Sequence, residues 1–255
     1  MTVYVHGDIH GSALEVKSCL SQIKNPRAND VIVVCGDAGL EYGDSVQGSA
    51  KKAMKKFPGR WLVLRGNHDT RYWRDHADDT EKWHVETMFG NETLVQNKYP
   101  NIHYAKDEGG IYTLQGCGNE NNGVKCLFVP GAYSVDKFYR LRNHYPYEYE
   151  EQLDYKEFSN LYDMAIESKD EIDFVFAHTF PLKMEGKLSY LFMDGIDQSE
   201  VSKNSEKWLD TIMGTIENGK RFKHYFGGHY HDDRELDGKY TLLYHNTVEL
   251  EDYIG

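Results

Sequence analysis

Short apolar runs separated by polar loops recur along the chain and predict a series of buried β-strands. The runs are rich in β-branched and aromatic residues, which is typical of strands that are buried on both faces. Between several of the runs, apolar residues recur at helical spacing. This alternation of strands and helices predicts an α/β fold with much parallel sheet. The apolar runs cover residues 3–5, 31–35, 61–64, 174–177 and 225–226.

The same reading predicts three amphipathic helices and two segments of different character. The apolar stripes run from Ala13 to Ile23, from Phe158 to Ala165 and from Trp208 to Ile216. Residues 102–135 and 236–250 instead carry the turn sequences DEGG and DG between strand-like runs, as β-hairpins do. We therefore expect a second, more antiparallel sheet. No repeat or linker-like tract interrupts the 255 residues, so we expect a single domain over residues 1–255.

Composition narrows the class of protein. Hydrophobic residues make up 40% and charged residues 27% of the chain, which is typical of a globular protein. The formal net charge of −12 argues against general nucleic-acid binding, which needs Lys and Arg. No apolar stretch approaches the ~20 residues of a membrane span, and the N-terminal residues run directly into a polar motif rather than a targeting segment. We expect a cytoplasmic protein, without membrane contact, whose four cysteines are reduced thiols.

The polar loops that follow the five apolar runs carry the candidate chemistry. In chain order they read GDIHG, GD, GNHD, HTFP and GGHYH. Because ligands gather outside the carboxyl ends of the strands in α/β sheets, five such loops can converge on one site. Together they offer seven oxygen and nitrogen ligands, namely Asp8, His10, Asp37, Asn67, His178, His229 and His231.

This donor set predicts a site for two metal ions. Seven ligands are too many for one ion and suit two, particularly if one carboxylate bridges, and they fit Mn, Fe or Zn better than Cu(I). Two such ions about 3.5–4 Å apart can hold a bridging water and lower its pKa, so that the hydroxide attacks phosphorus in line. The leaving alkoxide needs a proton, for which His68 is the expected general acid. We expect Asp69 to orient His68 or to tune its pKa.

The five blocks in this order resemble the calcineurin-like metallophosphoesterase superfamily. The segment PGAYSVDKFYRLRN, residues 130–143, resembles its small bacterial and phage-type members. The resemblance spans residues 7–231. It implies a four-layer αββα sandwich of two mixed β-sheets, with His68 as the catalytic acid. It also implies two divalent ions that share Asp37, for which we expect manganese, with iron or zinc as alternatives. One ion would take Asp8, His10, Asp37 and His231, and the other Asp37, Asn67, His178 and His229.

One block departs from the protein-phosphatase branch of that superfamily. The branch carries GDxxDRG, whereas here Leu40 and Glu41 stand at its Asp and Arg positions. The resemblance therefore supplies neither the carboxylate partner of the catalytic His nor one phosphate-binding Arg. Candidate substrate contacts are instead Arg65, Lys137, Arg140 and Arg142, with solvated surface charge as the alternative.

We expect from these features a dinuclear-metal-dependent phosphoesterase of small phosphorylated substrates, which are either phosphomonoesters or nucleotide-type phosphodiesters. One alternative is a DNA or RNA nuclease of the same superfamily, against which the charge of −12 argues. The other is a non-catalytic scaffold with this fold. The intact ligand set and His68 argue against the scaffold.

Overall fold

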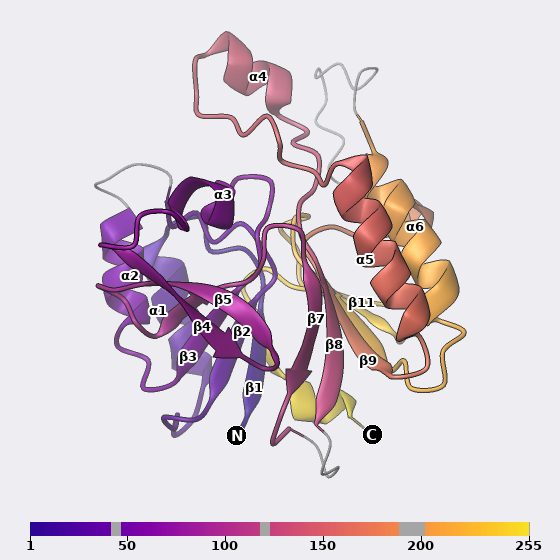
Figure 1. Cartoon of the computed structure of the whole chain (residues 1–255), viewed down its shortest axis with the longest axis horizontal. Coiled ribbons are helices and arrows are strands. Elements are labelled where there is room, and N and C mark those ends of the chain that lie inside the picture. Colours follow the sequence, from indigo (N-terminus) through magenta and orange to yellow (C-terminus); the bar gives the residue numbers. More distant parts are fainter. Residues whose placement is uncertain (42–46, 118–122, 189–201, 255) are drawn as a thin grey trace.

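The chain folds into two β-sheets that pack face to face, with helices on both outer faces (Figure 1). The structure is a computed structural model, and it describes residues 1–41, 47–117, 123–188 and 202–254. Within these residues the fold is the expected α/β four-layer αββα sandwich of two mixed sheets.

The first sheet contains seven described strands in the order β13-β1-β2-β3-β6-β5-β4. Its centre is parallel, because β1, β2, β3 and β6 run in the same direction, and its remaining pairings are antiparallel. The strands are β1 (Val3–His6), β2 (Val31–Val34), β3 (Arg60–Val63), β4 (Trp83–Met88), β5 (Asn91–Gln96), β6 (Ile102–Tyr104) and β13 (Thr247–Glu249).

The second sheet contains six described strands in the order β11-β12-β10-β9-β8-β7. Its four central strands are parallel and its two edge strands pair antiparallel. The expectation of a more antiparallel second sheet was therefore wrong. The strands are β7 (Gly110–Leu114), β8 (Val124–Val129), β9 (Ile172–Ala177), β10 (His224–Gly227), β11 (Arg234–Leu236) and β12 (Tyr240–Leu242).

Of the two turn sequences expected to form hairpins, DG does so and DEGG does not. The DG turn closes a hairpin between β11 and β12, where Asp237 and Gly238 take positive φ angles of 53° and 67°, a region that Gly and Asp tolerate. The DEGG turn is not a hairpin, because it joins β6 of the first sheet to β7 of the second. A turn sequence shows that the chain reverses but not which sheet the next strand enters.

Three buried clusters fill the spaces between the four layers. In β2, Val31 and Val33 pack between the two sheets, whereas Ile32 and Val34 face the helices α1 (Ala13–Gln22) and α2 (Gln47–Met54). Strands buried on both faces explain the continuous apolar runs in the sequence. On the other side of the molecule, α5 and α6 cover the second sheet (Figure 1).

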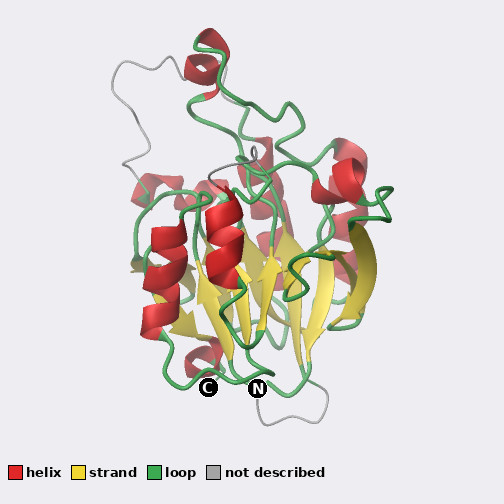
Figure 2. Ribbon diagram, turned by 90° about the vertical axis from the view of Figure 1, so that its left-hand side faces the viewer, coloured by secondary structure: helices red, strands yellow, loops and turns green. Residues whose placement is uncertain are grey.

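The three predicted amphipathic helices are all present, as α1 (Ala13–Gln22), α5 (Tyr155–Glu167) and α6 (Asn204–Ile216). Figure 2 shows the arrowheads of several strands pointing to one end of the molecule, where α4 projects from the body, while both termini lie at the other end. No described helix has the length and apolar character that crossing a bilayer requires. The remaining elements are α2 (Gln47–Met54), α3 (Tyr72–His76), α4 (Lys137–Arg142) and the 3₁₀ helices η1 (Leu182–Lys187) and η3 (Leu250–Tyr253).

Candidate metal centre

The predicted ligands follow the carboxyl ends of five parallel strands. Asp8 follows β1, Asp37 follows β2, and Asn67 follows β3 in the first sheet. His178 follows β9 directly, and the His229/His231 pair follows β10 in the second sheet. The two sheets present these ends at the same edge of the sandwich, so residues 221 positions apart in the chain come into contact.

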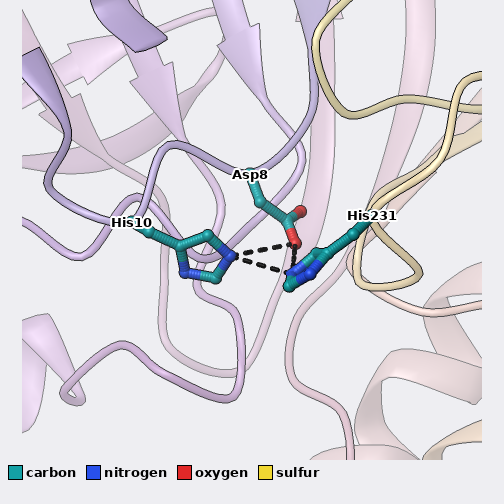
Figure 3. A group of neighbouring side chains, drawn as sticks. All are labelled: Asp8, His10 and His231. Carbon is teal, nitrogen blue, oxygen red and sulfur yellow. Dashed lines mark hydrogen bonds and ion pairs between the residues drawn. The ribbon is translucent and has the colours of Figure 1, made fainter. Parts of the chain in front are cut away.

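Asp8, His10 and His231 form the first group of ligand atoms, and their side chains point toward one another (Figure 3). The Nε2 atoms of His10 and His231 are 2.9 Å apart, and they lie 3.6 and 3.2 Å from Asp8 Oδ2. Two ligands of one tetrahedral ion, each at ~2.1 Å, stand about 3.4 Å apart. The triangle therefore has the size that a single bound ion requires.

The second group contains Asp8, Asp37 and His178. His178 Nδ1 donates to the carbonyl oxygen of Cys35 at 2.9 Å, which leaves Nε2 facing the site. This Nε2 lies 2.7 Å from Asn67 Oδ1 and 3.4 Å from Asp37 Oδ1. Burial acts against a charge here, but the carboxylates of Asp37 and Asp8 raise the pKa of His178 to about 9. The surroundings of this nitrogen therefore favour a positive charge.

His229 completes the second side of the site. Its ring lies edge-on to the His178 ring, with the centroids 5.0 Å apart. Burial lowers the pKa of His229 well below its usual value, so the imidazole is neutral, which is the form that binds metals. Its backbone N–H donates to Asp8 Oδ1 at 3.0 Å.

Asp8 belongs to both groups, and Asp37 belongs to the second group and lies beside His10 of the first. Asp37 Oδ2 is 3.9 Å from His10 Nδ1, and its Oδ1 faces His178 Nε2. Asp8 approaches His178 only through Nδ1, at 3.9 Å, and the proton of that nitrogen is directed to Cys35. Each carboxylate thus reaches one group through a ligand nitrogen and the other group through Nδ1 of a ring, so the sharing of Asp37 by two ions stays a prediction.

The backbone is strained at four of the predicted ligands. His10, Asp37, His229 and His231 have φ angles of 49°, 45°, 71° and 50°, a region that non-glycine residues seldom adopt. Such conformations cluster at functional sites, where the surrounding contacts hold them. Here the Asp37 carbonyl accepts the N–H groups of both Ile9 and His10, at 3.0 and 2.8 Å.

Two motif glycines make room for the carboxylates. A Cβ atom on Gly66 would lie 2.1 Å from Asp37 Oδ1, and one on Gly228 would lie 2.1 Å from Asp8 Oδ1. Neither distance is compatible with a side chain. The glycines of GNHD and GHYH are therefore required because a ligand of another loop occupies the space.

His68 lies at the rim of the centre, beside His10, with the ring centroids 6.0 Å apart. Its backbone N–H donates to Asp37 Oδ1 at 2.7 Å. Its Nε2 is 4.0 Å from Asp136 Oδ1, a carboxylate that follows no motif and that the sequence analysis missed. Burial lowers the pKa of His68, and the charges of Asp37 and Asp136 oppose that effect.

The structure does not bring the Asp69 carboxylate to the His68 ring among the described contacts. This carboxylate accepts the backbone N–H groups of Ala38, Gly39 and Gly66 at 3.2, 2.7 and 2.8 Å and the Tyr72 hydroxyl at 2.7 Å. The side chain is buried and no described contact joins it to the His68 ring. Asp69 thus ties the GD loop to the GNHD loop.

The predicted substrate contact by Arg65 was wrong. Its side chain is fully buried, and its guanidinium donates to the carbonyl oxygens of Glu151 and Asp107 at 2.8 and 3.4 Å. Arg65 therefore holds loops together behind the site.

Lys137 and Arg140 belong to α4, which projects above the carboxyl ends of the strands (Figure 1). Arg140 Nε donates to Asp136 at 2.7 Å, and Lys137 Nζ lies 5.8 Å from the centre of the Tyr133 ring. Both residues are partly exposed, and the neighbouring Arg142 is more exposed. Their contact with a substrate stays a prediction.

Leu40 and Glu41, the departures from the phosphatase pattern, point away from the metal centre. Leu40 is part of the core against α1 and α2. Glu41 pairs with Lys51 and accepts the Tyr104 hydroxyl at 3.2 Å. These contacts explain why neither residue serves His68.

Several partners of the predicted ligands were not anticipated. Tyr244 stacks on the His231 ring, with centroids 4.7 Å apart and an interplanar angle of 18°. Ser134 accepts a hydrogen bond from Asn67 Nδ2 at 2.8 Å. Neither residue stands in a recognisable motif, so only the tertiary structure reveals them.

Comparison with known proteins places the chain in a family. A family model described as calcineurin-like phosphoesterase matches residues 1–233. Among solved structures, the chain is similar to a phosphopantetheinyl hydrolase from Mycobacterium tuberculosis, with 11% identity, a TM-score of 0.49, and coverage of 95% of this chain and 89% of that one. It is also similar to a protein of unknown function from Aquifex aeolicus, with 13% identity, a TM-score of 0.42, and coverage of 98% and 96%. The comparison with curated proteins finds no match. The chain belongs to the calcineurin-like phosphoesterase family and is a metal-dependent phosphoester hydrolase.

Proposed function

We propose that this enzyme binds two divalent ions, preferably Mn²⁺, and hydrolyses a small phosphomonoester or a nucleotide-type phosphodiester. The observation that carries the proposal is that two groups of ligand atoms lie side by side, with Asp8, His10 and His231 in one and Asp8, Asp37 and His178 in the other. Asn67 and His229 lie beside His178, and we take Asp37 as the carboxylate that the two ions share. The residues fit divalent ions because they are carboxylate, amide and imidazole donors held within hydrogen-bonding distance of one another.

The metal ligands and His68 together fit the hydrolysis of a phosphate ester. When bound, two divalent ions supply a water nucleophile at neutral pH and neutralise charge on the phosphoryl oxygens. His68 stands at the partly exposed rim, with 21% of its side chain exposed, where a leaving oxygen can reach its Nε2. We assign it the transfer of a proton to that oxygen.

The net charge of the chain bears on the size of its substrate. The chain carries −12 overall, which disfavours a long polyanion unless basic side chains gather along its path. Arg140 on α4 pairs with Asp136, the carboxylate beside His68, and Lys137 lies on the same helix. These two basic side chains suffice for one or two phosphate groups. A small phosphorylated molecule is therefore the proposed substrate.

The test is hydrolysis by the purified Mn²⁺-loaded chain. We expect cleavage of p-nitrophenyl phosphate or of bis-p-nitrophenyl phosphate, and loss of that activity with EDTA or in Asp37→Asn. The ratio of the two rates assigns the mono- or diesterase class. Cleavage of single- or double-stranded DNA without cleavage of either small ester would replace this proposal with a nuclease. No cleavage of any of them would refute it.

A further inference from the structure

Four buried polar residues form a closed set of contacts behind the Asn67 side of the metal centre. Asn67 Nδ2 donates to Ser134 Oγ at 2.8 Å, and the Ser134 N–H donates to Glu151 Oε1 at 3.1 Å. The Glu151 carbonyl accepts a hydrogen bond from Arg65, two residues before Asn67, at 2.8 Å. The exposed fraction of each residue is 2% or less. The set therefore links three loops without contact to bulk solvent.

The Asn67 amide has two ends of similar shape, of which only the oxygen can bind a metal ion. In the structure Oδ1 faces His178 Nε2 at 2.7 Å, on the side of the ligands, and Nδ2 faces Ser134. The Ser134 N–H donates to Glu151 Oε1, and the Ser134 hydroxyl acts on the pKa of the same carboxyl group, so the two side chains are neighbours. A hydroxyl proton directed at that carboxylate would leave the hydroxyl lone pairs for Asn67. A turned amide would place its oxygen against those lone pairs and its N–H₂ group against the metal ligands.

Ser134 is itself held in place by the neighbouring backbone. Its loop is anchored by the Gly131 N–H, which donates to the Arg65 carbonyl at 2.9 Å. A Cβ atom on Gly131 would lie 2.4 Å from the Glu151 carbonyl oxygen, so the two loops are in close contact. The hydroxyl therefore has little freedom to move away from Asn67.

We propose that Ser134, oriented by Glu151, is a positioning residue that fixes the Asn67 amide with its oxygen toward the metal ions. This inference rests on the proposed function, because it takes Asn67 as a ligand. Ser134 belongs to no metal-binding motif and contacts no ligand other than Asn67 among the described hydrogen bonds. Its effect on metal binding is thus transmitted through the orientation of one amide.

The experiment measures Mn²⁺ binding to the full chain by isothermal titration calorimetry. In Ser134→Ala we expect one of two Mn²⁺ ions to bind about 10–100-fold more weakly, with the other unchanged. Ser134→Thr, which keeps the hydroxyl, should restore the affinity. Ser205→Ala is the matched control, because Ser205 is also a buried serine with one side-chain hydrogen bond, to Gln152 at 3.1 Å.

A double-mutant cycle separates orientation from packing. Asn67→Asp has two equivalent oxygens and therefore no orientation to lose. In that background Ser134→Ala should change the affinity by no more than about twofold. Circular dichroism shows which variants are folded, and Ser134→Cys, which keeps the volume, replaces Ser134→Ala if the latter unfolds.

The outcomes distinguish the inference from the proposed function. If the unsubstituted chain binds two Mn²⁺ ions and Ser134→Ala binds both with the same affinity, the inference is overturned and the proposed function stands. If Ser134→Ala weakens binding equally in the unsubstituted chain and in the Asn67→Asp background, the inference is overturned too, because the hydroxyl would then act by packing alone. If the unsubstituted chain binds no Mn²⁺, the proposed function fails, and the inference fails with it.

Discussion

At the scale of single residues, His68 and Asp69 are neighbours with opposite roles. The His68 ring is partly exposed at the rim of the metal centre, whereas the Asp69 carboxylate is buried and accepts four hydrogen bonds. Sequence proximity suggested a catalytic pair, because the GNHD motif places them side by side. The direction of each side chain could not be predicted, since it depends on the GD loop, which is 30 residues away from Asp69 at Gly39.

His68→Ala should separate proton transfer from metal binding. The substitution removes the proposed proton donor but no predicted ligand, so we expect the bound metal to be unchanged. Turnover should fall by about 10²–10⁴-fold for esters with alkoxide leaving groups, and much less for p-nitrophenyl esters, whose leaving group needs no proton. Steady-state rates over a series of leaving groups measure this. An equal loss across the series would contradict the role of His68 as the acid.

Asp69→Asn should act on stability. The amide would point an N–H₂ group at backbone N–H donors of residues 38, 39 and 66 and leave at least one of them unsatisfied, at a cost of about 1–3 kcal/mol in the free energy of unfolding. Urea denaturation measures this change. His68→Ala is the control and should leave the midpoint nearly unchanged. A stable Asp69→Asn with an altered leaving-group dependence would return Asp69 to the catalytic role.

Among the elements, a strand could be predicted from the sequence where it is buried on both faces. β1, β2 and β9 are buried on both faces, so their apolar runs were visible in the sequence. β4 has four exposed residues between two buried ends and gave no such signal. The placement of β6 and β7 in different sheets could not be predicted either, because a turn sequence carries no information about the sheet that the next strand joins.

Helix α5 offers a test at this scale. Asp154 caps its first turn: the carboxylate accepts the Glu157 N–H at 2.7 Å, and the Glu157 carboxylate accepts the Asp154 N–H at 2.8 Å. Asp154→Ala should lower the free energy of unfolding by about 1 kcal/mol. Thermal unfolding followed by circular dichroism checks this, with the unchanged metal content as control. An unchanged melting temperature would show that the cap is dispensable, and that packing against α6 and the Arg71–Glu157 ion pair hold the start of α5.

At the scale of the whole molecule, the site joins two sheets that share no hydrogen bonds among the described strands. The ligands that lie together could be predicted from the sequence, because each follows the carboxyl end of a strand. Ser134, Asp136 and Glu151 were not anticipated, because the segments before α4 and α5 that carry them contain no ligand motif. Such partners depend on how the layers pack, and that information is spread over the entire chain.

The lowered pKa values of two buried histidines predict how the stability of the fold depends on pH. Burial lowers the pKa values of His103 and His224 to about 4, below the ~6.5 of the unfolded chain. Between these values the unfolded chain binds more protons, so the free energy of unfolding should fall as the pH falls from 6.5 toward 4, by up to about 1.4 kcal/mol per pH unit for each histidine.

Urea denaturation between pH 7 and pH 4.5 measures this loss. Both rings contact a threonine hydroxyl, at 3.0 Å for His103 and 2.8 Å for His224. Glutamine can replace that contact without a titrating group, so the double variant His103→Gln/His224→Gln should lose less stability over this range. An equal loss in the variant would assign the pH dependence to other groups.

We propose that the two sheets together hold a pair of metal ions at Asp37. Anomalous diffraction from a Mn²⁺-soaked crystal tests it most directly. We predict two peaks about 3.5–4 Å apart, one beside Asp8, His10 and His231 and the other beside Asn67, His178 and His229, with Asp37 between them. A single peak, or two peaks without Asp37 between them, would contradict the account.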